Sequence, residues 1–189
     1  MTDPVPAGRR EQHKADTRRA LEDAALRRFA TDGYDATSVQ SIAADVGVSA
    51  RTFFRYFATK DEVLDMGRGA RQAQVRDAVR SSEARGLELV RVAVLALADG
   101  LADDRARVAL RQRAAASSPV LRGRVLDTIG SWERTLAAAL ADRGEPGADP
   151  LAAVGVAVFR SAITAWVRDG GDLTTHVDGG FRALAAPRR

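Results

Sequence analysis

The stretch SVQSIAADVGVSARTFFRYFATK, residues 38–60, decides the fold of this chain. Four apolar residues of its first part recur at spacings of three and four: Val39, Ile42, Ala43 and Val46. This spacing places them on one face of an α-helix. Gly47 follows directly and is the residue type best able to end a helix in a left-handed conformation, while the hydroxyl of Ser49 can cap the next helix. The stretch therefore predicts two short helices joined by a tight turn.

The second of these helices is rich in aromatic residues. Phe53 and Phe57 lie four residues apart and share one face, which we expect to be buried. We expect this face to pack on Leu21, Phe29 and Ile42. Phe54, Arg55 and Tyr56 point away from it, and exposing such rings on a short helix is unfavourable unless they contact a partner. Two helices joined by a short glycine-containing turn form the helix-turn-helix motif, whose second helix enters the DNA major groove.

The outward residues have the chemistry of a DNA contact. A phenyl ring can meet thymine methyl groups, a tyrosine hydroxyl can donate to phosphate, and arginine can bind guanine or phosphate. Lys60 combines its charge with main-chain N–H groups near the start of a helix, which suits a phosphate. Thr37 and Ser38 are predicted to do the same where the first helix of the motif begins.

The rest of the chain is predicted to be helical, since no stretch alternates with the period of two that a strand shows. We expect helices near residues 14–31, 60–82, 87–102, 104–116, 119–144, 151–168 and 173–185. The expected fold class is all-α: a disordered basic arm at 1–13, a three-helix DNA-binding domain at 14–60, and a helical C-terminal domain at 61–189. The arm is interpreted either as a solubilising tail or as a segment that reaches DNA phosphates or a minor groove.

Two further features concern the second half. Gly67 and Gly69 fall inside the expected helix at 60–82, where each costs about 1 kcal/mol relative to alanine and favours a bend. The helix at 151–168 is apolar on two faces, so it needs two partners, one of which can be a second subunit.

Composition excludes several classes of protein. The net charge of +4 is too small to identify a nucleic-acid binder, so DNA affinity must come from the placement of a few charges. The chain has no cysteine, its two histidines are far apart, and no phosphate loop, catalytic constellation or metal-ligand spacing is present. We therefore expect no cofactor, no metal and no enzymatic activity. The longest apolar run, residues 92–98, is too short to cross a bilayer, which predicts a soluble cytoplasmic protein without a membrane contact.

The pattern TSVQSIAADVGVSARTFFRYFATKDEVL, preceded by AALRRFATDGYDA, resembles the DNA-binding domain of TetR-family transcriptional repressors over residues 14–65. In the second half, the motifs LRQR, SSPVLR and WVRDGG resemble the C-terminal domain of mycofactocin-type regulators. The resemblance implies an all-helical homodimer that binds a palindromic double-stranded DNA operator. It also implies a small-molecule effector in the C-terminal domain, dimer contacts through the helix at 151–168 and the last helix, and release of DNA when the effector moves the fourth helix.

Functional residues are carried over by position. Thr52, Tyr56 and Lys60 match the family's phosphate contacts, together with Thr37 and Ser38. The groove-facing positions are Ala50, Arg51, Phe54 and Arg55. Ala50–Arg51 and Arg55–Tyr56 depart from the residues common in the family, so the operator sequence does not carry over. Candidate effector-pocket residues are Arg111, Trp132, Phe159 and Arg160.

Two alternatives remain open from the sequence. A non-specific architectural DNA-binding protein would show a steep salt dependence without sequence preference, and the small net charge disfavours it. A small helical enzyme or ligand-storage protein would use residues 87–186, and the missing catalytic constellation disfavours it.

Overall fold

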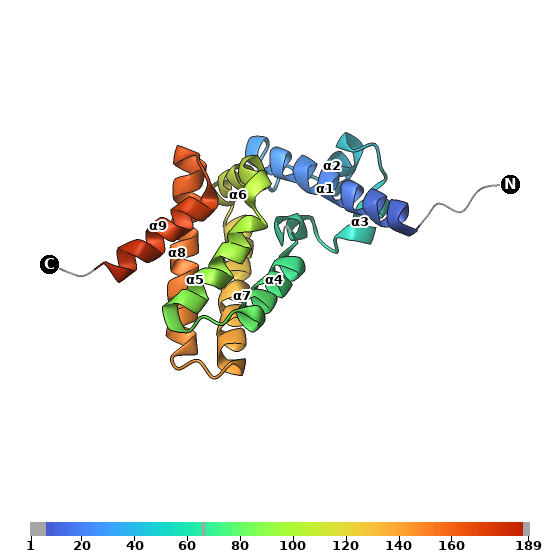
Figure 1. Ribbon diagram of the computed structural model, residues 1–189. Coiled ribbons are helices and arrows are strands. Elements are labelled where there is room, and N and C mark those ends of the chain that lie inside the picture. The colour runs from blue at the N-terminus through green and yellow to red at the C-terminus, as the bar shows by residue number, and fades with distance from the viewer. Residues whose placement is uncertain (1–6, 66, 187–189) are drawn as a thin grey trace. The chain divides into compact units, whose positions relative to one another are not determined.

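The computed structural model describes residues 7–65 and 67–186, which form nine α-helices and two 3-10 helices without a strand (Figure 1). The prediction of an all-α fold is confirmed. The first elements in chain order are α1 (Ala7–Thr31), α2 (Val39–Asp45), α3 (Ala50–Tyr56), η1 (Lys60–Asp65) and α4 (Arg68–Ser81). They are followed by α5 (Gly86–Asp99), η2 (Ala102–Asp104), α6 (Arg105–Ser117), α7 (Pro119–Asp142), α8 (Ala148–Asp169) and α9 (Leu173–Ala185).

The helices group into two compact units. The first comprises Met1–Met66 and Leu110–Val125, and the second comprises Gly67–Ala109 and Leu126–Arg189. The division therefore runs through α6 and α7, whose adjoining ends belong to the first unit. The sequence predicts the domain boundary at residue 60, where the DNA-contacting stretch ends. No pattern in residues 110–125 indicates that they group with residues so distant in the chain.

The first unit is built on one apolar cluster. Phe53, Phe57, Phe29 and Ile42 are buried in it with Leu21, as the spacing of the aromatic residues predicts. Ala114 of α6 and Leu121 of α7 complete the cluster and are fully buried. The turn between α2 and α3 also follows the sequence: Gly47 has φ +71°, and the Ser49 hydroxyl accepts a hydrogen bond from the main-chain N–H of Thr52 at 3.1 Å.

In the second unit, α5 contacts α4, α8 and α9, which makes it the central helix (Figure 1). The apolar sequence of this helix predicts that position. Its buried residues are Leu89, Val90, Ala93, Val94, Leu97 and Ala98. Helix α8 is long and apolar enough, by length and composition, to cross a membrane. Phe159, Ala162 and Trp166 of α8 are almost fully buried where this helix packs among its neighbours, so α8 is a core helix of the second unit.

Two predictions of where helices begin and end are wrong. The segment expected to be a disordered arm lies partly in α1, which begins at Ala7. Helical hydrogen bonding extends backward from the buried part of α1 because each further residue adds one bond, and Gln12 donates to Asp16 one turn later at 3.0 Å. Residues 1–6 of the expected arm lie outside the described residues.

The expected continuous helix over residues 60–82 is interrupted. Residues 60–65 form the 3-10 helix η1, and Gly67 precedes α4 with φ +74°, a left-handed conformation that an α-helix does not contain. Glycine reaches this conformation without steric cost, so a residue expected to weaken a helix in fact separates two.

Candidate nucleic-acid interface

Helix α3 presents to solvent three of the residues that we expected to face a DNA groove. Arg51, Phe54 and Arg55 are exposed, and Phe54 as a residue is 54% exposed. The ring of the preceding residue, Phe53, is fully buried and meets the Phe54 ring edge-on with centroids 5.7 Å apart. The buried ring therefore fixes the helix while the next ring is left available for a partner.

The remaining expected contacts on α3 are half-buried. Ala50 and Thr52 lie in the first turn, where the Thr52 hydroxyl is 3.1 Å from that of Ser49. The Tyr56 ring packs against the edge of the apolar cluster, and the Arg55 guanidinium lies 5.3 Å from its centroid. Arg18 of α1 donates to the Tyr56 carbonyl at 3.1 Å, which ties the end of α3 to α1.

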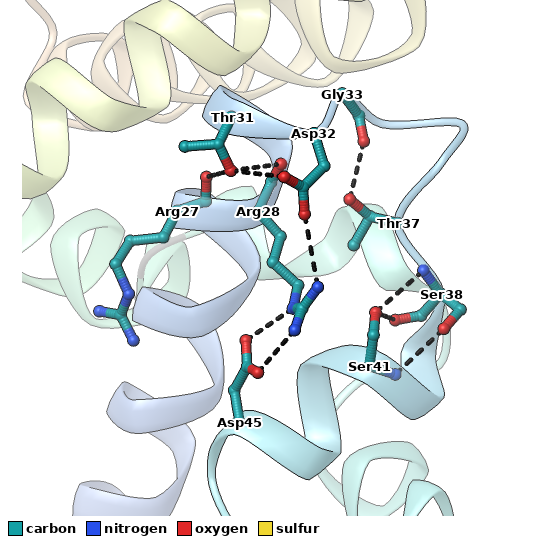
Figure 2. A network of polar contacts seen from close by, with 9 residues as sticks. All are labelled: Arg27, Arg28, Thr31, Asp32, Gly33, Thr37, Ser38, Ser41 and Asp45. Carbon is teal, nitrogen blue, oxygen red and sulfur yellow. Dashed lines mark hydrogen bonds and ion pairs between the residues drawn. The ribbon is translucent and has the colours of Figure 1, made fainter.

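At the start of α2, Ser38 and Ser41 form a reciprocal cap, in which each side chain accepts from the main-chain N–H of the other (Figure 2). Ser38 is exposed, whereas Thr37 is buried and its hydroxyl donates to the Gly33 carbonyl at 2.7 Å. In this structure the Thr37 hydroxyl is thus engaged inside the loop between α1 and α2.

Lys60 is also engaged within the unit. Its ammonium group donates to the carbonyls of Tyr34 at 2.7 Å and Thr37 at 3.0 Å, and lies 3.9 Å from the centroid of the Tyr34 ring. Carbonyl oxygens and an aromatic face are favourable surroundings for a cation. Lys60, the first residue of η1, therefore links η1 to the loop between α1 and α2.

A bidentate ion pair joins α1 to the end of α2 (Figure 2). Arg28 donates through Nε and Nη2 to the two carboxylate oxygens of Asp45, both at 2.6 Å, and its Nη1 is 3.4 Å from Asp32. The bonds from Arg28 hold the pKa of Asp45 below its ordinary value. Sequence reasoning missed this pair, because its two members are 17 residues apart and neither belongs to a motif.

A second polar group lies at the hydroxyl of Tyr34. Asp61 accepts from the Tyr34 hydroxyl at 3.4 Å and from Arg124 of α7, whose Nη2 is also 3.5 Å from Thr59. Burial alone would raise the pKa of Asp61, but bonds from Arg124, its own main chain and Thr59 together lower it. Burial and the nearby Asp61 charge raise the pKa of Tyr34.

The four candidate effector residues do not share one environment. Trp132 and Phe159 of the second unit are buried and meet edge-on with centroids 5.5 Å apart. The Trp132 Nε1–H is buried and has no hydrogen-bond partner among the described residues. Arg160 is exposed on α8, and Arg111 is buried in the first unit. Among the described residues no group of three His, Asp or Glu side chains is placed to hold a metal ion.

Comparison with known proteins agrees with this geometry. The family model of bacterial regulatory proteins of the TetR family matches residues 21–65, and the model of the MftR C-terminal domain matches residues 85–189, more than half of the chain. The chain belongs to the TetR family. It is a DNA-binding helix-turn-helix regulator of transcription with an MftR-type C-terminal domain.

Individual relatives match different parts of this TetR-family chain. MftR of Mycobacterium tuberculosis is 27% identical over 168 residues, covering 84% of this chain and 83% of the relative. The regulator TcmR of Streptomyces glaucescens is 45% identical over 60 residues, which are 32% of this chain and span only 26% of the length of TcmR. The stronger identity is therefore confined to a segment about as long as a DNA-binding domain.

Solved structures share the fold. FadR of Bacillus subtilis in complex with stearoyl-CoA has a TM-score of 0.64 at 21% identity, covering 90% of this chain and 98% of that one. FadR of Thermus thermophilus, a TetR-family repressor in complex with lauroyl-CoA, has a TM-score of 0.58 at 23% identity, with coverages of 91% and 96%. At these identities the likeness establishes the fold.

Proposed function

We propose that this TetR-family chain is a cytoplasmic repressor that binds a palindromic operator as a homodimer and is released from it by a small-molecule effector. The observation that carries the proposal is the outward face of α3. Arg51, Phe54 and Arg55 are exposed on this helix, while Phe53 and Phe57 are buried and hold it in place. The chain acts by binding and not by catalysis.

The groove contacts come from Ala50, Arg51, Phe54 and Arg55, and the backbone contacts from Ser38, Thr52 and Tyr56. Base-edge contacts discriminate between sequences, whereas phosphate contacts act on every sequence alike. Thr37 and Lys60 contribute through the loop that they hold, because their polar groups already have partners within the unit.

Dimerisation uses α8 and α9. Both helices carry a large apolar side chain toward solvent, Val154 at 37% and Leu184 at 53% exposure. The exposed face of α8 also includes the small residues Ala153 and Ala157, which allow a second helix to approach closely. Two heads on one face of DNA would contact half-sites about 34–36 Å apart or a multiple of that distance.

The effector binds in the C-terminal domain, and Trp132 and Phe159 are its candidate contacts. Acyl-CoA is the first class to test, since two FadR structures of this fold hold lauroyl-CoA and stearoyl-CoA. Release requires an effector that binds the free and DNA-bound conformations with different affinities.

The test begins with selection of binding sequences from a random double-stranded DNA pool by the full chain. We expect an inverted repeat, protected on two half-sites, and weaker binding on addition of lauroyl-CoA. Selection of no sequence at low salt contradicts the proposed function. Binding without sequence preference but with a steep salt dependence identifies an architectural protein instead.

Variants separate the parts of the proposal. Arg55→Ala is expected to change the preferred sequence, and Tyr56→Phe to weaken binding to all sequences evenly. Val154→Arg is expected to yield monomers in sedimentation, whereas Val120→Arg, at a similarly exposed valine of α7, leaves the dimer intact. A dimer that survives Val154→Arg places the interface elsewhere.

A further inference from the structure

The ion pair between Arg28 and Asp45 has a geometry that matters for DNA reading, provided that the proposed DNA-binding function holds. The guanidinium and the carboxylate meet in two parallel hydrogen bonds of 2.6 Å, the arrangement that fixes both distance and orientation (Figure 2). Their side chains are 31% and 34% exposed, so the pair lies at the surface. Exposed pairs contribute little to stability, so stability alone does not account for such a defined geometry.

The position of Asp45 connects the pair to α3. Asp45 is the last residue of α2, and only four residues separate it from Ala50, the first residue of α3. These four residues form the turn, in which Val48 donates to the carbonyl of Ala43 and the Ser49 hydroxyl caps α3. Because the turn is short and internally bonded, a shift of Asp45 is passed to the first turn of α3.

The buried phenylalanines do not fix that end of α3. Phe53 lies in its middle and Phe57 directly follows it, and Arg18 holds the carbonyl of Tyr56 at its last residue. The first turn, which carries Ala50 and Arg51, is linked to α1 through the preceding turn, where Val46 and Val48 pack against the apolar cluster, and through the Asp45 carboxylate. Arg28 and Arg18 of α1 thus hold the residues on either side of α3, Asp45 at the end of α2 and Tyr56 at the end of α3 itself.

We infer that Arg28 and Asp45 are positioning residues for DNA reading: through the turn, their bidentate pair sets the orientation of the first turn of α3. The charged groups that face Asp45 are Arg28 and, through space, Arg27, both on α1, while Asp32 faces Arg28. Neither member of the pair needs to touch DNA for this role.

Removal of Asp45 distinguishes positioning from simple electrostatics. If Arg28 were a phosphate contact for which Asp45 merely competes, Asp45→Ala would free a cation, remove a negative charge and strengthen binding to DNA. If the pair sets orientation, the same substitution weakens binding to the selected operator although the net charge becomes more favourable. The two roles therefore predict changes of opposite sign.

The experiment measures binding of the full chain to its selected operator and to unrelated DNA, for Arg28→Ala, Asp45→Ala and the double variant. We expect each single variant to lose about threefold to tenfold in operator affinity. The double variant loses no more than either single variant, because the pair acts as one unit. Arg27→Ala is the matched control: Arg27 is the exposed neighbour of Arg28, and no dashed line joins its side chain to Asp45 in Figure 2.

Thermal melting of each variant separates a positioning role from unfolding, since all four proteins should melt within a few degrees of the parent. Tighter operator binding by Asp45→Ala, or losses that add in the double variant, overturn the inference. Failure of the parent chain to select any sequence overturns the proposed function instead, so the two failures are distinguishable.

Discussion

The first unit carries its candidate functional side chains on its surface, whereas the second unit carries its aromatic candidates in its interior. In the first unit the expected DNA contacts point outward from one seven-residue helix, and polar ties such as the Arg28–Asp45 pair and the Lys60 contacts hold the scaffold behind them. In the second unit the aromatic candidates Trp132 and Phe159 are buried among packed helices. A large rigid partner such as DNA needs a surface, whereas a small effector needs an enclosed space.

This difference explains why DNA binding can be predicted from the sequence and the effector-binding site cannot. A surface that meets DNA needs particular residues at fixed spacings on a short helix, and such a pattern is visible in a sequence. An interior that encloses a ligand is lined by the same apolar residues that any helical core contains. The comparison can be tested by changing buried and exposed members of each unit.

The largest expected effect separates two adjacent phenylalanines of α3. Phe53→Ala removes a fully buried ring from the core of the first unit and should cost about 3–5 kcal/mol of stability. Phe54→Ala removes the ring of a residue that is 54% exposed and should leave stability within about 0.5 kcal/mol while weakening operator binding. Denaturant unfolding and a DNA titration on both variants measure this. A large loss of stability in Phe54→Ala would show that its ring belongs to the fold and not to an interface.

In the second unit the comparable test uses two glycines within helices. A Cβ on Gly155 of α8 would collide with Val90 of α5 and lie 3.3 Å from Leu136 of α7. Gly155→Ala should therefore destabilise by about 1–3 kcal/mol through overpacking. Gly69→Ala in α4 meets nothing within 4 Å and should stabilise by about 0.5–1 kcal/mol. Calorimetry measures both changes, and an unchanged melting temperature for Gly155→Ala would mean that α5 and α8 separate easily.

Lys60 provides a test in which sequence and structure predict different results. As a phosphate contact alone, its loss would weaken DNA binding and leave stability unchanged. Because its ammonium group donates to the carbonyls of Tyr34 and Thr37, Lys60→Met should also destabilise the protein by about 1–3 kcal/mol. Lys14→Met, at an exposed lysine of α1, is the control for charge. Equal melting temperatures for the two variants would restore the simple phosphate role.

What could be predicted from the sequence was local. The cap at Ser49, the turn at Gly47 and the inward Phe53 and Phe57 all follow from spacings of a few residues, and the structure confirms each of them. The helices of the remainder were predicted from the absence of a period of two and from apolar spacing, and the TetR resemblance implied how they divide into a DNA-binding and a C-terminal domain.

What could not be predicted depends on contacts between distant segments. The Arg28–Asp45 and Arg124–Asp61 pairs join residues 17 and 63 positions apart, and an arginine or aspartate on a helix surface carries no mark of its partner. The same reason explains two further misses. Residues 110–125 belong to the first unit, and the Lys60 ammonium group donates to main-chain carbonyls of a distant loop.

The smallest expected effect is a pH dependence located in the first unit. Because the folded-state pKa of Asp61 is lowered, its contribution to stability is present above the pKa of the unfolded chain, about 3.9, and is lost as pH falls through the folded value. Asp61→Asn should therefore be less stable than the parent at pH 7, and the difference in denaturation midpoint should shrink below pH 4 as the parent loses the ion pair with Arg124. Asp35→Asn, at an exposed aspartate of the neighbouring loop, should run parallel to the parent throughout. A difference for Asp61→Asn that stays constant to pH 3 would mean that the Arg124 contact contributes nothing through its charge, and that the start of α7 is held in the first unit by the apolar packing of Leu121 and Val125.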